Sequence, residues 1–291
     1  MRADLHTHSC ASDGRLKPAE LVTAAYRVGL NVIAITDHDC VEGIDPALEA
    51  ARNLSNMTVI PGVEVSTDVP RGEVHILGYF IDHHDPGLLT TLEKLRASRL
   101  ARAQKMVAKL GELGLPVDWD RVLEFAGDGA IGRPHIAQAM LERCYITSLR
   151  EAFDKYLGRQ GPAYVEREKI TPSEAVQLIV KASGLPVLAH PADIEGLEQM
   201  IPKLQKAGLI GIEVYYGGYP AKVKGYLASL CQKFDLIPCG GSDYHGLDES
   251  NETPLGGVGV PEDGVYQLFA LAEERDRIAS GVTQPPHQPQ Y

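Results

Sequence analysis

Several features that would set this chain apart from ordinary globular proteins are scarce or absent. No uninterrupted apolar run approaches the roughly 20 residues that a membrane-spanning helix needs. The five cysteines are an odd number and form no CxxC pair, so we expect free thiols rather than a disulfide framework. The first six residues lack the apolar core of a signal peptide. These absences predict a cytoplasmic protein.

The chain also lacks an excess of basic residues. Its 28 Lys and Arg against 39 Asp and Glu give a net charge of −11, which argues against passive coating of nucleic acid. An enzyme that acts on phosphates remains compatible, because bound divalent metals reverse the local charge of a site. What the chain does have is ten histidines in 291 residues, several of them in short motifs that also hold carboxylates.

Strand and helix signals alternate in two blocks of the chain, 1–85 and 171–291. Compact β-branched runs such as NVIAIT at 31–36 are typical of buried parallel strands. This alternation predicts an α/β barrel. Residues 86–170 contain no such runs and begin with a long amphipathic pattern at 88–113. We therefore expect a helical insert domain at 86–170, locally basic on an acidic body.

The first polar motif, DLHTH, places His6 and His8 at i, i+2 spacing near a strand end, where α/β barrels carry their active sites. Both imidazoles then lie on one face of the strand and can grip a metal together. Asp4 has the same parity and is a candidate for orienting a ligand. Asp13, in the SDG that follows, is either a turn residue or a ligand of a second metal.

A second apolar strand ends in TDHD. Burying unpaired charges costs several kcal/mol, so packing does not explain this motif, and His38 is predicted to bind a metal or act in catalysis. Asp37 and Asp39 are candidates for ligands, for groups that orient a ligand, or for a helix cap. Glu64, in PGVE at the end of the third strand, can bridge two cations.

Three further motifs contain histidine. His75 lies in the apolar strand EVHILGYF, where a lone histidine is more often a hydrogen-bonded core residue. His190 in AHP is a ligand or a cap before a proline turn, and Asp243 and His245 in SDYH repeat the i, i+2 spacing after a glycine-rich turn. The whole set suits two or three divalent ions, with Mn²⁺, Zn²⁺ and Fe²⁺ as candidates. It comprises His6, His8, Asp13, His38, Glu64, His75, His190, Asp243 and His245.

The motifs DLHTH, SDG, TDHD, GVE, AHP and SDYH, in this order over residues 4–245, resemble those of the PHP superfamily, named for polymerase and histidinol phosphatase. The resemblance implies a distorted seven-stranded β/α barrel with a trinuclear metal site at its mouth. It implies one metal on His6, His8, Glu64 and Asp243, a second on Glu64, His75 and His190, and a third on Asp13, His38 and His245.

Within that superfamily, the chain most resembles the stand-alone subgroup with a helical insert. Some members of this subgroup remove the 3′-phosphate of 3′,5′-bisphosphonucleotides, and related members degrade short RNA from the 5′ end. GRPH at 132–135 looks like the subgroup's substrate-binding element. Arg133 can clamp a phosphate with its planar donor fork, and His135 can add a second donor. Alternatively, GRPH is a turn before a helix and Arg133 is solvated. The basic stretch 91–109 is either a solvated helix face or a means of steering an anionic substrate.

The predicted reaction is phosphoester hydrolysis by a metal-bound hydroxide, with the insert covering the barrel mouth. A metal-bound water or His245 is the candidate proton donor for the leaving group. The expected partner is a nucleotide or short RNA, with no membrane and no obligate protein partner. Tyr215, Tyr216 and Tyr219 could stack on a base or simply pack at the rim. The alternatives are a histidinol phosphatase, an amidohydrolase-type metallohydrolase, and a nucleotide-binding protein without turnover.

Overall fold

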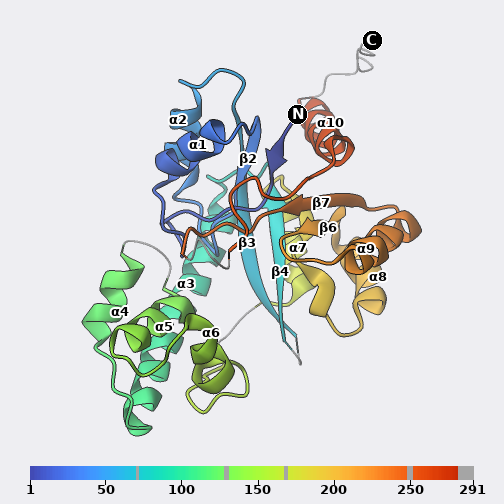
Figure 1. Cartoon of the computed structure of the whole chain (residues 1–291). Coiled ribbons are helices and arrows are strands. Elements are labelled where there is room, and N and C mark those ends of the chain that lie inside the picture. Colours follow the sequence, from blue (N-terminus) through green and yellow to red (C-terminus); the bar gives the residue numbers. More distant parts are fainter. Residues whose placement is uncertain (70–71, 128–130, 167–169, 248–251, 281–291) are drawn as a thin grey trace.

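Seven strands form one sheet in chain order in the computed structural model (Figure 1). The structure describes residues 1–69, 72–127, 131–166, 170–247 and 252–280. The strands are β1 (Ala3–Asp4), β2 (Val32–Ile35), β3 (Thr58–Val69), β4 (Gly72–Tyr79), β5 (Leu185–Leu188), β6 (Gly211–Tyr216) and β7 (Ile237–Gly241). Beyond β1, Leu5 N–H donates to the Gly240 carbonyl at 3.3 Å and His8 N–H to that of Tyr244 at 2.9 Å. The first and last strands therefore meet, and the predicted distorted seven-stranded barrel is confirmed.

The fourth strand runs against the others. β1, β2 and β3 are parallel, as are β5, β6 and β7, whereas β4 is antiparallel to both β3 and β5. The β3–β4 hairpin pairs Ser66 with His75. Because of this reversal, His75 lies near the start of β4 and still reaches the rim at which the parallel strands end.

Six α-helices accompany the barrel strands: α1 (Pro18–Arg27), α2 (Ile44–Ala51), α7 (Pro172–Lys181), α8 (Leu197–Ala207), α9 (Ala221–Phe234) and α10 (Glu262–Ala279), with a short 3₁₀ turn, η2 (Pro191–Asp193). Residues at the N-terminal ends determine where these helices begin, as α7 illustrates. α7 begins with a capping box, in which Thr171 Oγ1 accepts from Glu174 N–H while the Glu174 carboxylate accepts from Thr171 N–H. None of the helices in the described ranges is both long and apolar enough to cross a membrane.

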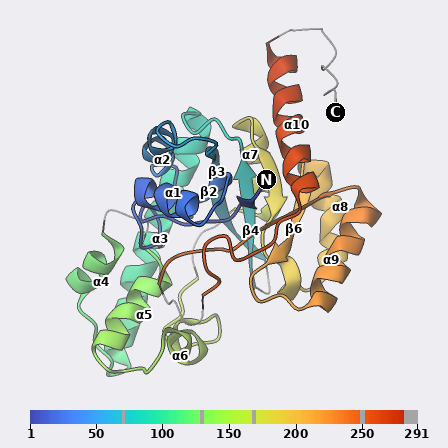
Figure 2. The same ribbon diagram turned by 45° about the horizontal axis from the view of Figure 1, so that its top comes forward.

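Between β4 and β5 lie α3 (Pro86–Glu112), α4 (Trp119–Ala126), α5 (Arg133–Glu142), α6 (Leu149–Ala152) and a π-helical turn, η1 (Phe153–Leu157). These helices group to one side of the barrel (Figures 1 and 2). They share an apolar cluster that includes Met106, Val122, Ile136 and Met140. The domain boundaries at 85/86 and 170/171 stay a prediction.

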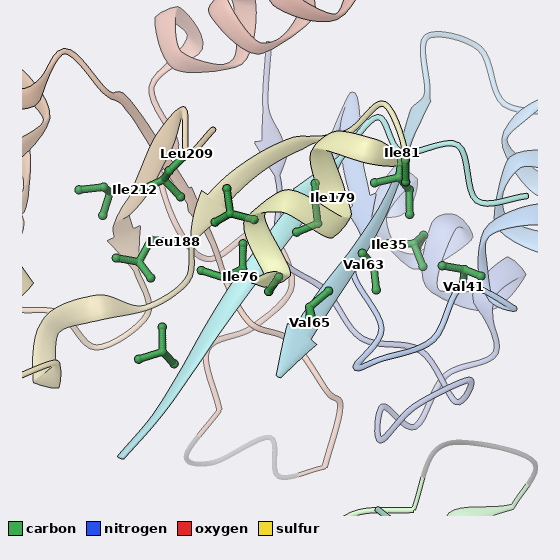
Figure 3. Close-up of a cluster of buried hydrophobic side chains, with 14 of the residues drawn as sticks. Ile35, Val41, Val63, Val65, Ile76, Ile81, Ile179, Leu188, Leu209 and Ile212 are labelled. Atoms are coloured by element: carbon green, nitrogen blue, oxygen red, sulfur yellow. The ribbon is translucent and has the colours of Figure 1, made fainter. Parts of the chain in front are cut away.

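The barrel strands are buried on both faces. Along β2, Ile33 and Ile35 join one apolar cluster with helices such as α1 and α7, whereas Val32 and Ala34 join a second cluster that includes residues of α10. Figure 3 shows part of the first cluster, where Ile179 of α7 lies over the β3–β4 hairpin. Near-continuous apolar strands are what such two-sided burial requires. The rigid sheet fixes the positions of the strand ends, which carry the candidate site.

Candidate active site

All nine residues predicted as metal ligands gather at one rim of the barrel. Glu64 and His75 belong to β3 and β4, and the others follow β1, β2, β5 and β7 in the chain. They form overlapping groups whose potential ligand atoms lie within 4.8 Å of one another. These groups are His6, His8, Glu64 and Asp243; His8, Asp13, His38 and His245; and His38, Glu64 and His75.

Glu64 lies at the centre of this cluster, and its two carboxylate oxygens face different histidines. Oε2 lies within 3.3 Å of one ring nitrogen each of His6, His8 and His38. Oε1 lies within 3.1 Å of one ring nitrogen each of His75 and His190. A carboxylate placed in this way can bridge two cations, as the sequence predicts.

The two aspartates extend the cluster away from Glu64. Asp243 Oδ1 lies 3.2 Å from His6 Nε2 and 3.0 Å from His8 Nε2. Asp13 Oδ1 lies 3.3 Å from His245 Nε2, and Asp13 Oδ2 lies 3.9 Å from His38 Nε2. His190, which is in none of the three groups, is held to the cluster by Glu64.

The cluster does not satisfy its own polar atoms. Seven of its buried atoms have no hydrogen-bond partner among the described residues: His6 Nε2, both ring nitrogens of His8, Asp13 Oδ1, His38 Nδ1, Glu64 Oε2 and Asp243 Oδ1. Each unsatisfied buried group costs ~1–3 kcal/mol, and a cation between these nitrogens and oxygens would satisfy several at once. The mixed imidazole and carboxylate donors are those that Mn²⁺, Zn²⁺ and Fe²⁺ accept. The residues therefore fit bound divalent metals.

The carboxylates of the cluster are ionised, and despite burial they raise the pKa values of His6, His8, His190 and His245, so a bound cation would take the place of imidazole protons. Burial alone would raise the pKa of Glu64, but His38, His75 and His6 hold that pKa well below its usual range. The pKa values of Asp13 and Asp243 are likewise held low by neighbouring histidines despite burial. Burial lowers the pKa of His75 to about 4, which keeps its imidazole neutral. The site thus presents three carboxylate anions to whatever occupies it.

Glu213 is a site residue that the sequence analysis missed. It lies on β6 and is fully buried. Its Oε1 is 3.1 Å from His6 Nδ1, and its Oε2 accepts from the backbone N–H of His190 at 2.7 Å. His190 has the strained φ of 26°, so one carboxylate orients an imidazole and fixes an unusual loop. The sequence feature that could have identified Glu213 is an acidic residue within the otherwise apolar strand GIEVYY.

The two aspartates of TDHD fix loops. Asp37 accepts from Ser9 N–H, from Ser9 Oγ and from Ser12 Oγ, each at 2.7 Å, which holds the loop that carries Asp13. Asp39 accepts from Ser66 N–H at 2.8 Å and from Arg99 Nε at 2.7 Å. Of the roles considered for the pair, these contacts match that of orienting the site.

An arginine-lined pocket of about 100 Å³ adjoins the metal-ligand cluster. Its wall includes Asp13, His38 and His75 of the cluster together with Arg99, Arg102 and Arg133 from the helices between β4 and β5. We call it the arginine pocket. Guanidinium groups are able to bind an anion such as phosphate, and in this pocket Glu73 pairs with Arg102 and Arg133.

The three arginines of this pocket are held differently. Arg99 is anchored by Asp39 and Ser66, and Arg133 by Glu73. The side chain of Arg102 is buried, and its Nη1 lies 3.7 Å from Glu73 Oε1, within ion-pair range but too far for a hydrogen bond. Burial, with Arg133 and Arg99 nearby, lowers the pKa of Arg102 to about 10. Arg102 therefore keeps a donor for an incoming anion.

The two predicted substrate-binding residues line different pockets, and their role in binding stays a prediction. Arg133 lines the arginine pocket. Its side chain is only 19% exposed and pairs with Glu73, so it is not a solvated surface residue. His135 is buried, its Nδ1 accepts from Gly132 N–H at 3.0 Å, and it lines a different cavity. Arg99 and Arg102 were not assigned. The sequence could have indicated them, because both arginines fall at the repeating buried positions of α3, in one row with Leu92, Leu95 and Met106.

A nearly closed seven-stranded barrel, with a metal-ligand cluster and an arginine pocket at its rim, defines a class of metal-dependent phosphoester hydrolases. The comparisons agree: the sequence matches the PHP domain family over residues 4–159. The chain belongs to the PHP family, and the resemblance seen in its motifs is confirmed.

Relatives cover nearly the whole chain. A 5′-3′ exoribonuclease of Haemophilus influenzae is 35% identical over 83% of this chain and 89% of its own length. A 3′,5′-nucleoside bisphosphate phosphatase of Chromobacterium violaceum is 34% identical over 89% of this chain and 91% of its own length. A solved structure from Chromobacterium violaceum, described as an amidohydrolase with bound sulfate and no metal, is 33% identical, has a TM-score of 0.83 and covers 94% of this chain and 97% of that one.

Proposed function

We propose that this chain hydrolyses phosphate monoesters of nucleotides, with the 3′-phosphate of 3′,5′-bisphosphonucleotides as its main target. Two or three divalent cations, Mn²⁺ first among them, would be held by His6, His8, Asp13, His38, Glu64, His75, His190, Asp243 and His245. When bound, such cations supply Lewis acidity and neutralise charge on the phosphoryl oxygens. The named relative that removes a phosphate from nucleoside bisphosphates supports this substrate class.

The observation that carries the proposal is the arginine pocket beside the cluster. A 3′,5′-bisphosphonucleotide has two phosphates on one ribose, so a second anion site next to the reacting centre is needed. Arg102 Nη1 is buried and makes no hydrogen bond within the described residues, with Glu73 Oε1 3.7 Å away, and Arg99 and Arg133 are fixed around it. A second phosphate would add a strong acceptor for these guanidinium groups, which a substrate with one phosphate, or a neutral amide or lactone, does not offer.

His245 serves as a metal ligand in this proposal. Its Nδ1–H donates to the Asp243 carbonyl at 2.9 Å, so Nε2 is the nitrogen that would bind a metal, in place of the proton that the nearby Asp13 favours there. That nitrogen faces Asp13 Oδ1 at 3.3 Å. A histidine whose other nitrogen is held by a carbonyl is oriented as metal ligands usually are. We therefore do not assign the leaving-group proton to His245.

A second candidate activity, 5′→3′ hydrolysis of short RNA, is favoured by a groove that begins at the arginine pocket. This groove of about 710 Å³ runs along α3 and shares Arg102 with the pocket. Lys94 and Lys105 line it, both exposed. Glu166 and Glu174 also line it, so its charge is mixed. A nucleotide chain beyond the first residue could follow the two lysines.

Phosphate release from adenosine 3′,5′-bisphosphate by Mn²⁺-loaded protein tests the proposal, with an EDTA-treated sample alongside. We expect metal-dependent release that leaves adenosine 5′-monophosphate. Arg102→Gln should reduce this release, whereas Arg96→Gln, which changes a surface arginine of the same helix, should not. No release from protein shown to hold metal would overturn the assignment, and histidinol phosphate and short RNA would be the next substrates.

A further inference from the structure

A second, larger cavity opens beside Asp13 and is not used by the chemistry described so far. It has a volume of about 730 Å³ and lies between the loop that contains Cys10 to Arg15 and the helices α4 and α5. It shares Asp13 with the arginine pocket, and its other lining residues are different. The cavity therefore borders the same metal-ligand cluster from a different direction.

The lining of this cavity differs in chemistry from the arginine pocket. Its apolar wall consists of Phe125, Leu141, Leu149 and Leu247. Acidic residues also line it, namely Asp13, Glu124 and Glu142, and its basic side chains are Arg15 and His135. Because both glutamates are paired with Arg121, the lining has little free charge and favours a flat, neutral, partly apolar group over a phosphate. A volume in the range of 300–1,000 Å³ is typical of small-molecule sites.

Phe125 is fixed as one part of this wall. The Arg121 guanidinium carbon lies 4.3 Å from the centre of the Phe125 ring. Arg121 is in turn held by Glu142, with Nε to Oε2 at 2.8 Å, and by Glu124. The aromatic ring is thus braced by a cation that is itself anchored on α4 and α5, which suits a stacking platform.

Gln138 supplies the polar counterpart. It lies on α5, is half-buried and lines the cavity. Its amide makes no hydrogen bond within the part of the chain that the structure describes. A glutamine amide both donates and accepts, which matches the edge of a nucleobase. An aromatic ring and a free amide in one cavity are the two elements that base recognition needs.

We propose that this cavity binds the nucleobase of the substrate, with Phe125 stacking on the base and Gln138 bonding to its edge. The inference rests on the proposed nucleotide substrate and adds the part of the protein that recognises its base. The acidic and apolar cavity takes the base, and the arginine pocket and the metal-ligand cluster take the phosphates. The substrate would then lie with its base on one side of Asp13 and its phosphates on the other.

The tyrosines that the sequence offered as stacking residues are engaged in another way. Tyr216 Oη donates to Asp243 Oδ2 at 2.8 Å, and Tyr219 Oη accepts from Ala192 N–H at 3.0 Å. Both hydroxyls therefore support the loops of the metal-ligand cluster. Their role as base platforms stays a prediction.

Inhibition of the metal-loaded wild type provides the first test. Adenosine 5′-monophosphate and ribose 5-phosphate differ only in the base, and both should compete with adenosine 3′,5′-bisphosphate. We expect the adenine nucleotide to bind at least about fivefold more tightly, because stacking of one base contributes that much or more. Equal inhibition constants would overturn the proposal.

Variants then locate the effect. Phe125→Ala and Gln138→Leu should each weaken the adenine nucleotide about fivefold or more and leave ribose 5-phosphate unchanged. Leu123→Ala, an exposed residue of the same helix as Phe125, is the matched control and should change neither constant. Gln138→Leu keeps the test valid if Phe125→Ala fails to fold. Wild-type constants in a folded Gln138→Leu protein and in a folded Phe125→Ala protein would refute the assignment.

Failure of the proposed function is distinguishable from failure of this inference. If the metal-loaded protein releases no phosphate from the bisphosphate, the proposed function fails. Calorimetric titration of adenosine and of ribose into the same sample then tests the cavity alone. Binding of adenosine but not ribose, lost in Gln138→Leu, would support the base site. Absence of adenosine binding would reject it.

Discussion

Replacing Glu213 by glutamine should disable the metal site without disturbing the fold. Glu213 accepts hydrogen bonds from His6 Nδ1 and from the backbone N–H of His190. A glutamine of the same volume has one accepting oxygen and one donating amide. If its oxygen serves His190, its amide donates to His6 Nδ1, and the ring proton moves to Nε2. That nitrogen, which faces Glu64 and Asp243, would no longer have a lone pair for a metal.

The expected magnitude follows from this change of tautomer. Loss of a group that orients a metal ligand typically costs 10–100-fold in metal affinity or activity, which corresponds to ~1.4–2.7 kcal/mol. The assay is a Mn²⁺ titration of metal-free protein by calorimetry, followed by phosphate release at saturating Mn²⁺. A circular dichroism melt of each variant reports whether the fold is kept.

Glu198→Gln is the matched control, because Glu198 is an exposed residue that pairs with Lys233 on the surface. It should bind Mn²⁺ as the wild type does. Wild-type Mn²⁺ affinity in a folded Glu213→Gln protein would refute the reasoning, since it would mean that His6 does not depend on Glu213 for its tautomer.

Three further predictions follow from the same site. Arg102→Met should lower kcat/KM for adenosine 3′,5′-bisphosphate by about tenfold or more, with Tm unchanged or raised, since it removes a buried charge while Glu73 keeps Arg133 as its partner; a lower Tm would show that the guanidinium stabilises the fold. Removal of metal should lower Tm by about 5–10 °C relative to Mn²⁺ at 100 times its Kd, and identical calorimetric melts with and without EDTA would contradict the assignment of the cluster as a metal site. Tyr216→Phe removes the hydroxyl that donates to Asp243 and should weaken Mn²⁺ about tenfold in the same titration; an unchanged affinity would show that Asp243 is held without it.

Much of the barrel could be predicted from the sequence because its signals are local. Buried strands read as short β-branched runs, and α3 was expected at 88–113 and spans Pro86–Glu112. The reversed direction of β4 could not be read in this way, because an apolar strand looks alike in either direction. Its pairing with β3 and β5 decides that direction.

The residues of the site likewise differ in whether a local sequence pattern reveals them. His6 and His8, or Asp243 and His245, are recognisable because both members of a pair lie within three residues. Glu213 acts on His6 from 207 residues away, and no local pattern indicates that distance. The arginines of α3 occupy core positions, but only the packed structure shows that their part of the stripe faces an anion pocket instead of the apolar core.

The ion pair between Asp39 and Arg99 has a consequence for how this protein can be altered or diversified. Asp39 is fully buried beside His38 on the barrel, and Arg99 reaches it from α3 at 2.7 Å. Excising the helices between β4 and β5 would take the guanidinium from a buried carboxylate, a loss of the kind that costs ~3–5 kcal/mol. The three arginines of the pocket would leave with them. A barrel without these helices would keep the metal-ligand cluster and lose the proposed anion site, so we expect substitutions in these helices and in the TDHD loop to occur together.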